Sequence, residues 1–389
     1  MTPLTVAWIS DFPVEWLPDA PESLRRLPRQ HPAMWELVLL GELENNPALR
    51  LHVIVLRSRV ERSFDFERHG VTFHILKYCG GTRASTFYWM DTWLIRRALG
   101  RIQPHIVHAW GNEKGAGLVA ARLHYPFLIT IQGLFTWYGR HVPLPLHDKI
   151  SVLAEKVSLS KARHASVESR FSVEFMRQRW PHLTVHQIEH APNWHFHHIE
   201  RRLAADPIRF MTTGTICRRK GTDLLLMALN ELRSELPFQL VVAGDPNESF
   251  LEPLRNTLSP ELWRRVEFKG HLQPEAVAEE LRTATLFLFP TRVDNSPNAV
   301  KEAVVAGVPV VASAVGGIPD YVVPGQNGVL FKPGDLAGFI QAIRQACQNP
   351  LFRAGRVAPE SLAASRAYLS PKRMGERFLE TYLAVCRQG

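Results

Sequence analysis

The chain has 389 residues, of which 46% are hydrophobic, and its formal net charge is +9. This length and composition predict a globular protein with two domains that each bury a core. Four cysteines lie far apart, without the spacing of a disulfide framework or a metal site, which favours a reducing compartment. The positive charge permits an acidic partner, but no nucleic-acid recognition motif accompanies it, so we expect no nucleic acid.

The N-terminal sequence enters a strand at residues 5–10 without a secretion signal, and every apolar run is shorter than the roughly 20 residues that span a bilayer. We therefore expect a cytoplasmic protein. One helical stretch, residues 86–101, is aromatic and basic, and it would suit peripheral contact with the inner face of an anionic membrane. Such a helix is more often docked on its own sheet, and we favour that interpretation.

From the N-terminus to residue 195, short apolar runs alternate with helical patterns, which predicts a doubly wound α/β domain. Its helices are expected mainly at residues 34–44, 86–101, 115–123 and 147–163. Its strands are expected at residues 5–10, 51–56, 71–76, 105–110, 127–132, 165–169 and 185–190.

An irregular, polar stretch near residues 192–206 separates this domain from a second α/β domain over residues 196–370. The predicted fold is therefore two Rossmann-like, doubly wound parallel-sheet domains that face a cleft. A last helix within residues 371–389 is expected to cross back to the first domain. The strands of the second domain are expected at residues 208–213, 238–243, 266–270, 285–289, 308–312 and 329–331.

The most informative stretch is residues 290–313, where a strand is followed by a polar loop with Asp294, a helix and a second strand. Ser296 and Pro297 are expected to be the cap and the first position of that helix, which should end at Gly307. Ligands collect beyond the carboxyl ends of parallel strands, so the loop is a candidate site. A plain crossover with a solvated Asp294 is the alternative.

The N-terminus of the same helix would suit a phosphate, because its first N–H groups are unpaired and carry partial positive charge. The amides of Asn298 and Ala299 are the candidates. Glu302 lies about six residues past the expected cap, which is roughly 9 Å along the helix axis, and its carboxylate would accept hydrogen bonds from ribose hydroxyls there.

A second basic loop, residues 213–222, follows the first strand of the second domain. Gly214 allows a tight turn, Lys220 supplies a point charge and Thr222 is expected to cap the next helix. Because both loops follow strands of one parallel sheet, they should open at the same edge. Lys220 with Arg218 or Arg219 would then neutralise a diphosphate without a metal. A basic surface turn is the alternative.

Weaker candidates follow other strands. Gly244 and the segment Gly270-His271-Leu272 end neighbouring strands, and the latter would line a base-binding slot, although turn chemistry explains both glycines equally well. In the first domain, His108, Gln132 and Gly133 end adjacent strands and would face an acceptor; a buried structural role is the commoner one for such a histidine. We expect no metal, because the evenly spaced histidines near residues 182–190 lie on an extended segment, where four residues span roughly 13 Å.

These motifs resemble those of the retaining glycosyltransferases of family four, which have the two-domain GT-B fold. The resemblance covers residues 208–335 and rests on Gly214 with Arg219-Lys220-Gly221, Asp294-x7-Glu302-Ala, Gly316-Gly317-Ile-Pro-Asp320 and Gly325-Gln-Asn-Gly328. It implies that the second domain binds a nucleotide-sugar and the first an acceptor. Lys220 would hold the diphosphate, Glu302 the ribose and the amides of residues 297–299 the distal phosphate, while Asp294 would approach the sugar.

Three positions depart from that family's pattern: Asp294 replaces a glutamate, Thr215 an arginine, and Gln132 a histidine. The hypothesis is a hexosyl- or pentosyltransferase that moves a sugar from a nucleoside diphosphate donor to a glycan or lipid-linked acceptor with retention, in bacterial-type glycan or glycoconjugate synthesis. No cofactor is expected beyond this co-substrate. The alternatives are a nucleotide-sugar epimerase on the same fold and a nucleotide-binding relative without catalysis.

Overall fold

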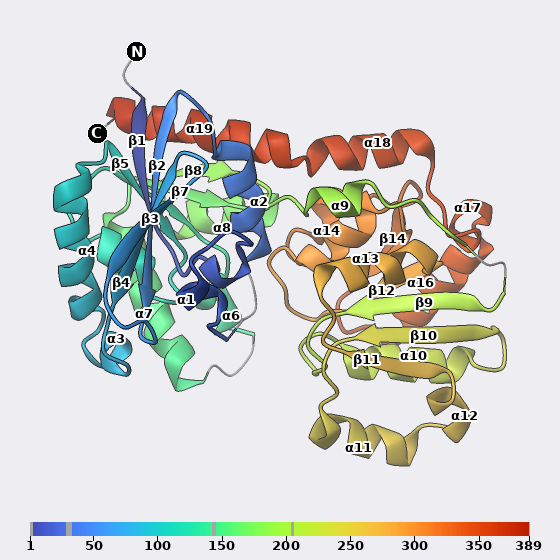
Figure 1. Cartoon of the computed structure of the whole chain (residues 1–389). Helices are drawn as coiled ribbons and strands as arrows, with labels where there is room; N and C mark the ends of the chain where they lie inside the picture. Colours follow the sequence, from blue (N-terminus) through green and yellow to red (C-terminus); the bar gives the residue numbers. More distant parts are fainter. Residues whose placement is uncertain (1–2, 29–32, 142–144, 204–205, 389) are drawn as a thin grey trace. The chain divides into compact units, whose positions relative to one another are not determined.

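The structure, a computed structural model, describes residues 3–28, 33–141, 145–203 and 206–388. The chain divides into two compact units, which we call unit 1 (Met1–Glu189 with Met374–Gly389) and unit 2 (His190–Arg373) (Figure 1). The boundaries lie a few residues from the expected positions. Each unit has one mainly parallel sheet with helices, so the α/β fold class predicted from the alternating pattern is confirmed.

The described part of unit 1 contains an eight-stranded sheet in the order β3-β4-β2-β1-β5-β6-β7-β8. All neighbours are parallel except β3, which is antiparallel to β4. The strands are β1 (Leu4–Ile9), β2 (Leu49–Arg57), β3 (Phe64–Arg68), β4 (Val71–Lys77), β5 (Ile106–Trp110), β6 (Phe127–Thr130), β7 (His164–Val167) and β8 (Thr184–Gln187).

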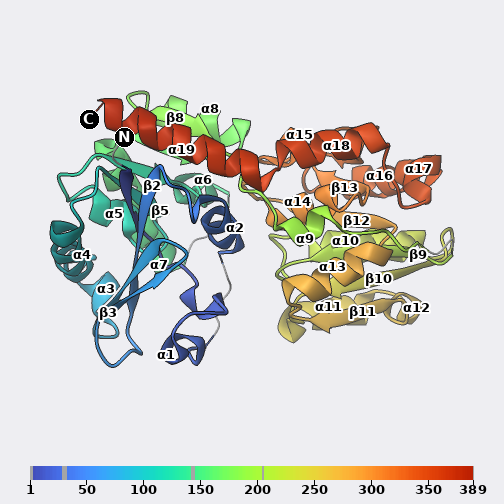
Figure 2. The same cartoon turned by 45° about the horizontal axis from the view of Figure 1, so that its top comes forward.

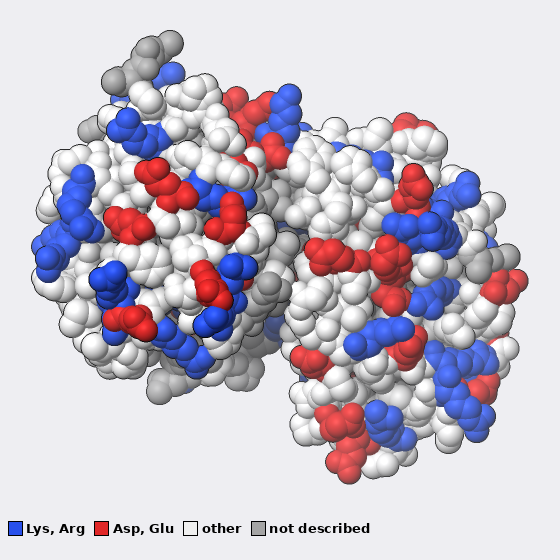
Figure 3. All heavy atoms as spheres, viewed as in Figure 1, with Lys and Arg blue, Asp and Glu red and all other residues white. Residues whose placement is uncertain are grey.

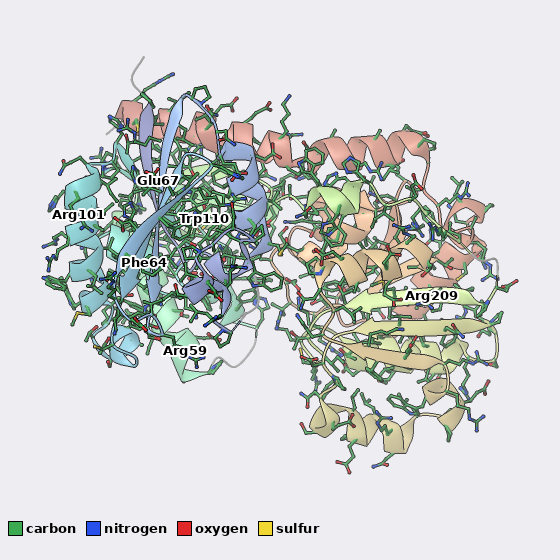
Figure 4. The ribbon with its side chains drawn as sticks, viewed as in Figure 1. Arg59, Phe64, Glu67, Arg101, Trp110 and Arg209 are labelled. Atoms are coloured by element: carbon green, nitrogen blue, oxygen red, sulfur yellow. The ribbon has the colours of Figure 1, made fainter. Side chains whose placement is uncertain are left out.

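Strand β3, whose Phe64 and Glu67 are labelled in Figure 4, is absent from the sequence-based prediction. Its side chains alternate between half-buried and exposed, and Phe66 stacks on Phe73 of β4 with ring centroids 4.8 Å apart. The two-residue alternation in the sequence was the signal that could have indicated this strand. The strand is short and charged, as edge strands often are, which made the signal weak.

The helices of unit 1 include the predicted ones, with some differences at their ends. The helix expected over residues 86–101 begins only at Trp89, as α4, and a separate short helix, α3, ends before it at Ser85. Phe87 and Tyr88 interrupt the helical backbone between them, with positive φ angles of 46° and 61°. The helical segments are η1 (Val14–Trp16), α1 (Glu22–Arg25), α2 (Met34–Leu43), α3 (Thr82–Ser85), α4 (Trp89–Ile102), α5 (Ala116–Ala120), α6 (Phe135–Tyr138), α7 (Leu146–Lys161), α8 (Arg170–Arg179) and α19 (Pro371–Gln388).

Helix α19 completes the core of unit 1 and lies beside α8 and β8 (Figure 2). Its Tyr382 is fully buried, and the hydroxyl accepts a hydrogen bond from Trp8 Nε1 at 2.9 Å and lies 2.7 Å from His108 Nδ1. His108 Nε2 lies 2.6 Å from the hydroxyl of Thr130. The C-terminal helix therefore joins unit 1 through a buried polar network, as well as through apolar contacts such as that of Phe378 with Trp110.

The described part of unit 2 contains a six-stranded parallel sheet in the order β11-β10-β9-β12-β13-β14. The chain starts at the central strand, builds one half of the sheet, and then returns to build the other half. The strands are β9 (Ile208–Thr213), β10 (Phe238–Ala243), β11 (Val266–Gly270), β12 (Leu286–Phe289), β13 (Val310–Ser313) and β14 (Gly328–Phe331).

Two apolar clusters cover the two faces of this sheet, and consecutive strand residues alternate between them. Leu286 and Leu288 of β12 belong to one cluster, whereas Phe287 and Phe289 belong to the other. A central parallel strand is buried on both faces, which explains its uninterrupted apolar sequence. The helices of unit 2 are α9 (Trp194–His197), α10 (Thr222–Leu232), α11 (Glu248–Thr257), α12 (Pro260–Trp263), α13 (Pro274–Thr283), α14 (Asn298–Val305), α15 (Ile318–Tyr321), α16 (Leu336–Gln348), α17 (Pro350–Arg353) and α18 (Pro359–Tyr368).

Replacing Tyr382 by Phe tests the role of α19 in unit 1. The change removes only the hydroxyl and leaves the buried Trp8 N–H without that partner, so we expect the free energy of unfolding to fall by about 1–3 kcal/mol. Chemical denaturation measures the loss. The control is Tyr125→Phe, which removes a hydroxyl bonded to Leu99 O at 3.2 Å in a half-buried position. An equal or larger effect of the control would contradict the assignment.

Candidate functional site

The candidate site lies where the strand order of unit 2 reverses. Strands β9 and β12 are neighbours, with Phe210 opposite Leu286 and Met211 opposite Phe287, but the chain leaves them toward opposite halves of the sheet. Ligands of open parallel sheets bind beyond the carboxyl ends of the strands at such a point. The loops that follow these two strands, residues 214–221 and 290–297, are the two that the sequence singled out.

The structure places these two loops in direct contact. The backbone N–H of Arg292 donates to Arg219 O at 2.9 Å, and Arg219 Nη1 donates to Val293 O at 3.3 Å. The guanidinium of Arg292 also binds both carboxylate oxygens of Asp223, the second residue of α10, at 2.7 and 2.9 Å. A bidentate pair of this kind fixes orientation as well as distance. Sequence analysis did not identify Arg292 or Asp223, although the arginine lies within the singled-out loop.

Two predicted catalytic residues form an ion pair across the loops. Lys220 Nζ lies 2.5 Å from Asp294 Oδ2, and the two side chains are 19% and 10% exposed. The ammonium also lies 5.2 Å from the ring centroid of Phe289, at the end of β12. An ammonium has three N–H donors, and Asp294 takes one of them. The lysine is therefore held at the sheet edge with donors that a ligand anion would use.

Two glycines allow the close approach of backbone segments. Gly221 has φ of 76°, and a Cβ there would lie 1.9 Å from Pro290 O. Gly316, with φ of 58°, would place a Cβ 2.1 Å from Asp294 O. Any other residue would therefore combine backbone strain with a clash. The loop after β13 thus packs against the loop that carries Asp294, and the Gly317 N–H donates to Asn295 O at 2.5 Å.

Helix α14 brings its N-terminus to the same loops, but its cap differs from the prediction. The helix begins at Asn298 with Pro297 as the N-cap residue, and no side chain caps it. The Ser296 hydroxyl is instead buried, without a hydrogen-bond partner among the described residues. The amides of Asn298 and Ala299 belong to the first turn, where N–H groups have no intrahelical acceptor. The helix ends at Val305 with Ala306 as the C-cap residue, two residues before the predicted end at Gly307, which has φ of 74°.

Glu302 lies on the same helix and is half-buried. Burial raises the pKa of its carboxyl from 4.5 to about 7, although the neighbouring Lys301 opposes this shift. The group therefore titrates near neutral pH. A hydroxyl-bearing ligand that donates hydrogen bonds to the ionised form would lower this pKa again.

The other donor-side candidates lie around the same edge. Thr215 and Arg218 are exposed on the loop after β9, and Gly214 beside them has φ of 125° and open space where a side chain would be. The predicted cap by Thr222 is wrong: Gly221 is the N-cap residue, and the Thr222 hydroxyl instead accepts from the Cys217 N–H at 3.3 Å. A small hollow adjoins this loop, lined in part by Gly214, Thr215, Lys220 and Pro290.

The loops after β10 and β11 lie on the far side of β9 from β12. Gly244 approaches Gly214 so closely that a Cβ would lie 2.2 Å from its carbonyl oxygen. Gly244 and Gly270 form an isolated bridge, and the exposed His271 donates its backbone N–H to Asp245 Oδ1 at 2.9 Å. Leu272 is half-buried. The structure therefore gives the glycines a packing role and leaves His271 accessible.

The acceptor-side candidates of unit 1 differ in their burial. His108 is fully buried within the network described above, so its prediction as an acceptor residue is wrong and its structural alternative is correct. Gln132 and Gly133 remain half-buried after β6. The Gly133 N–H donates to Glu113 Oε1 at 3.2 Å, and burial raises the pKa of Glu113. Sequence analysis missed this glutamate, which lies three residues after β5.

Within the described residues, no group of three or more His, Cys, Asp or Glu side chains has the arrangement of a metal site. The evenly spaced histidines make separate contacts: His186 Nε2 lies 3.2 Å from His164 Nδ1, and His182 Nε2 lies 3.0 Å from Leu159 O. The described helices also include none that combines the length and the apolar character needed to cross a bilayer.

The two parallel-sheet α/β units define a two-domain α/β protein, and comparison with solved structures gives the fold as GT-B. The sucrose-phosphate synthase of Thermosynechococcus elongatus has a TM-score of 0.78 and 17% identity, over 99% of this chain and 100% of that one. The Anabaena protein HepE, solved with UDP and glucose, has a TM-score of 0.68 and 14% identity, over 98% and 100%.

The sequence then gives the family of the C-terminal domain: residues 207–349 match the model of the group 1 glycosyl transferases and form a domain of that family. A glycogen synthase of Mycobacterium tuberculosis is 29% identical over 203 residues, which is 48% of this chain and 48% of that protein. The chain thus spans about half the length of the curated relatives it matches. The family resemblance that the motifs indicated is confirmed for this domain.

The raised pKa of Glu302 predicts a pH-dependent effect on stability. The folded state binds this proton more tightly than the unfolded state, so ionisation of Glu302 lowers the free energy of unfolding as the pH rises from 4.5 to about 7. Glu302→Gln cannot ionise. We expect it to resist denaturant better than the wild type at about pH 8, and to lose that advantage at about pH 4. A pH-independent difference, or the same difference in the exposed control Glu252→Gln, would refute the assignment.

Proposed function

We propose that the chain is a retaining glycosyltransferase that moves a sugar from a nucleoside diphosphate donor to an acceptor hydroxyl. The observation that carries the proposal is the position of Lys220 and the N-terminus of α14 at the switch point of a group 1 glycosyl transferase domain. The glycogen synthase and sucrose-phosphate synthase matches, and the UDP and glucose bound to HepE, support a nucleotide-sugar donor.

The proposed chemistry depends on stabilising the leaving group. The bond from the anomeric carbon to the diphosphate breaks, and the departing diphosphate gains negative charge. Lys220, the guanidinium of Arg219 or Arg218, and the amides of Asn298 and Ala299 would neutralise this charge without a metal. Electrostatic groups that are already oriented act most strongly on charge that develops in the transition state. The hydrogen bonds between the loops after β9 and β12 provide that orientation.

The remaining roles concern the donor's sugars and the acceptor. Glu302, in its ionised form, would accept hydrogen bonds from the ribose hydroxyls, and Asp294 would lie close to the transferred sugar. The acceptor hydroxyl attacks the anomeric carbon from the face that the diphosphate leaves. Its proton passes to an oxygen of the leaving diphosphate, so a new carbon–oxygen bond replaces the broken one and the configuration is retained.

The acceptor is proposed to be a glycan or a lipid-linked sugar, and unit 1 is proposed to bind it. Gln132 and Gly133 remain candidates for that role, whereas the buried His108 does not. Glu113 adds a titratable carboxyl beside Gly133. We place the reaction in glycan or glycoconjugate synthesis at the cytoplasmic side of the cell.

Substitutions at the ion pair test the donor site. Lys220→Gln should weaken the binding of UDP by about tenfold or more, because a charged hydrogen bond to the diphosphate is lost. Asp294→Asn should leave UDP binding unchanged or stronger, because the lysine no longer shares its charge, while transfer falls. Isothermal titration calorimetry and a donor-consumption assay measure the two effects. Lys269→Gln, a paired lysine on β11, is the control. Unchanged UDP binding by folded Lys220→Gln would refute the role of Lys220.

The two alternative functions predict different products. An epimerase on this fold would consume a nucleotide-sugar without an acceptor, whereas a non-catalytic relative would bind nucleotide without consuming any donor. The departures at Thr215, Gln132 and Asp294 favour testing the second alternative directly. We expect donor consumption that depends on the acceptor, measured over a panel of UDP-sugars and glycan acceptors. UDP binding without turnover across that panel would favour the non-catalytic alternative.

A further inference from the structure

Helix α4 of unit 1 has two distinct faces. Asp91, Thr92, Ile95, Ala98 and Leu99 are buried, and the helix packs with this face against β2, β4 and α5. Their spacing of three and four residues is that of one side of an α-helix. The sequence-based interpretation of a helix docked on its own sheet is therefore correct for this side only.

The other side of α4 exposes residues that surface helices usually do not expose together. Trp89, Met90 and Trp93 are 59%, 40% and 52% exposed, in the first two turns of the helix. Arg96, Arg97 and Arg101 follow on the same side and are also exposed. We call these six residues the α4 patch. Figure 3 shows Lys and Arg side chains gathered over this helix, and Figure 4 labels Arg101 there.

Guanidinium groups accompany the exposed rings of the α4 patch. Arg97 Cζ lies 5.1 Å from the ring centroid of Trp93, and Arg122 Cζ lies 4.2 Å from that of Trp89. The one acidic residue of the helix, Asp91, is buried and binds Arg83 at 2.7 Å. The exposed side therefore combines indole rings with positive charge, and no carboxylate of the helix neutralises it.

The backbone before α4 orients the patch. Phe87 and Tyr88 both have positive φ, which costs energy in residues with large side chains. The Tyr88 ring is packed so closely over Gly115 that a Cβ at that glycine would lie 2.4 Å from it. Arg122 also donates to Phe87 O at 2.8 Å. Tyr88 is thus turned inward, and the helix that begins one residue later presents Trp89 and Met90 outward.

We propose that the α4 patch docks unit 1 on the surface of an anionic phospholipid bilayer. Tryptophan is enriched at membrane interfaces, where its ring lies among the headgroups and its N–H remains hydrated. Arginines beside it would bind the lipid phosphates, and a basic surface helix with exposed aromatic residues is suited to lie in the plane of the interface. This surface contact is independent of the proposed sugar transfer.

Vesicle co-sedimentation of the full chain tests the proposal. Wild-type protein should bind vesicles of phosphatidylcholine mixed with phosphatidylglycerol, and should bind far less to phosphatidylcholine alone or at high salt. Arg96→Gln/Arg97→Gln/Arg101→Gln should weaken binding by about 100-fold, since each basic residue at an anionic surface contributes about fivefold. Trp89→Ala/Trp93→Ala should weaken binding without unfolding, because both side chains are exposed.

The matched control replaces three exposed arginines elsewhere in unit 1, Arg50→Gln/Arg59→Gln/Arg62→Gln, with the same change in net charge. It should retain most of the vesicle binding. An equal loss in this control would show an effect of overall charge and would overturn the assignment to α4. Two further results would overturn the assignment to α4. The first is equal binding to neutral and anionic vesicles. The second is no vesicle binding together with self-association in sedimentation velocity that Trp89→Ala/Trp93→Ala abolishes.

Discussion

The site of unit 2 depends on one constraint, the close contact between the loops after β9 and β12. Gly221 permits that contact, because a Cβ there would lie 1.9 Å from Pro290 O. The Arg292 guanidinium then clamps its loop to Asp223 at the start of α10. Lys220 and Asp294 face each other across the resulting junction, 2.5 Å apart. Lys220, Asp294 and the start of α14 owe their common position to this backbone junction.

The same arrangement explains why positive charge is available to a ligand. A fully exposed lysine side chain would lose conformational entropy on binding a diphosphate. The Lys220 side chain is already held between Asp294 and the Phe289 ring, so it would lose less. The N-terminus of α14 adds N–H groups whose orientation is fixed by the helix. Glu302, with its pKa raised to about 7, places a titratable carboxyl further along the same helix. Helix α14 thus carries partial positive charge at its N-terminus and a titratable carboxyl, that of Glu302, further along.

Much of this arrangement could be predicted from sequence, because central parallel strands are apolar on both faces and end in loops with glycine and charged residues. The positions of β9, β12, Lys220 and Glu302 follow from that pattern. Contacts between distant residues could not be predicted: the pair of Arg292 with Asp223 and the burial of His108 against Tyr382 depend on tertiary packing. The caps predicted at Ser296 and Thr222 were wrong: the Ser296 hydroxyl is buried without a hydrogen-bond partner among the described residues, and the Thr222 hydroxyl accepts from the Cys217 N–H within the preceding loop.

The most direct measurement of the central claim is a crystal structure of the protein with a bound nucleoside diphosphate. The account predicts that a phosphate oxygen lies within hydrogen-bond distance of Lys220 Nζ and of the amides at the start of α14, with the ribose hydroxyls on Glu302. A nucleotide bound elsewhere on unit 2, or one whose phosphates do not contact Lys220, would contradict it.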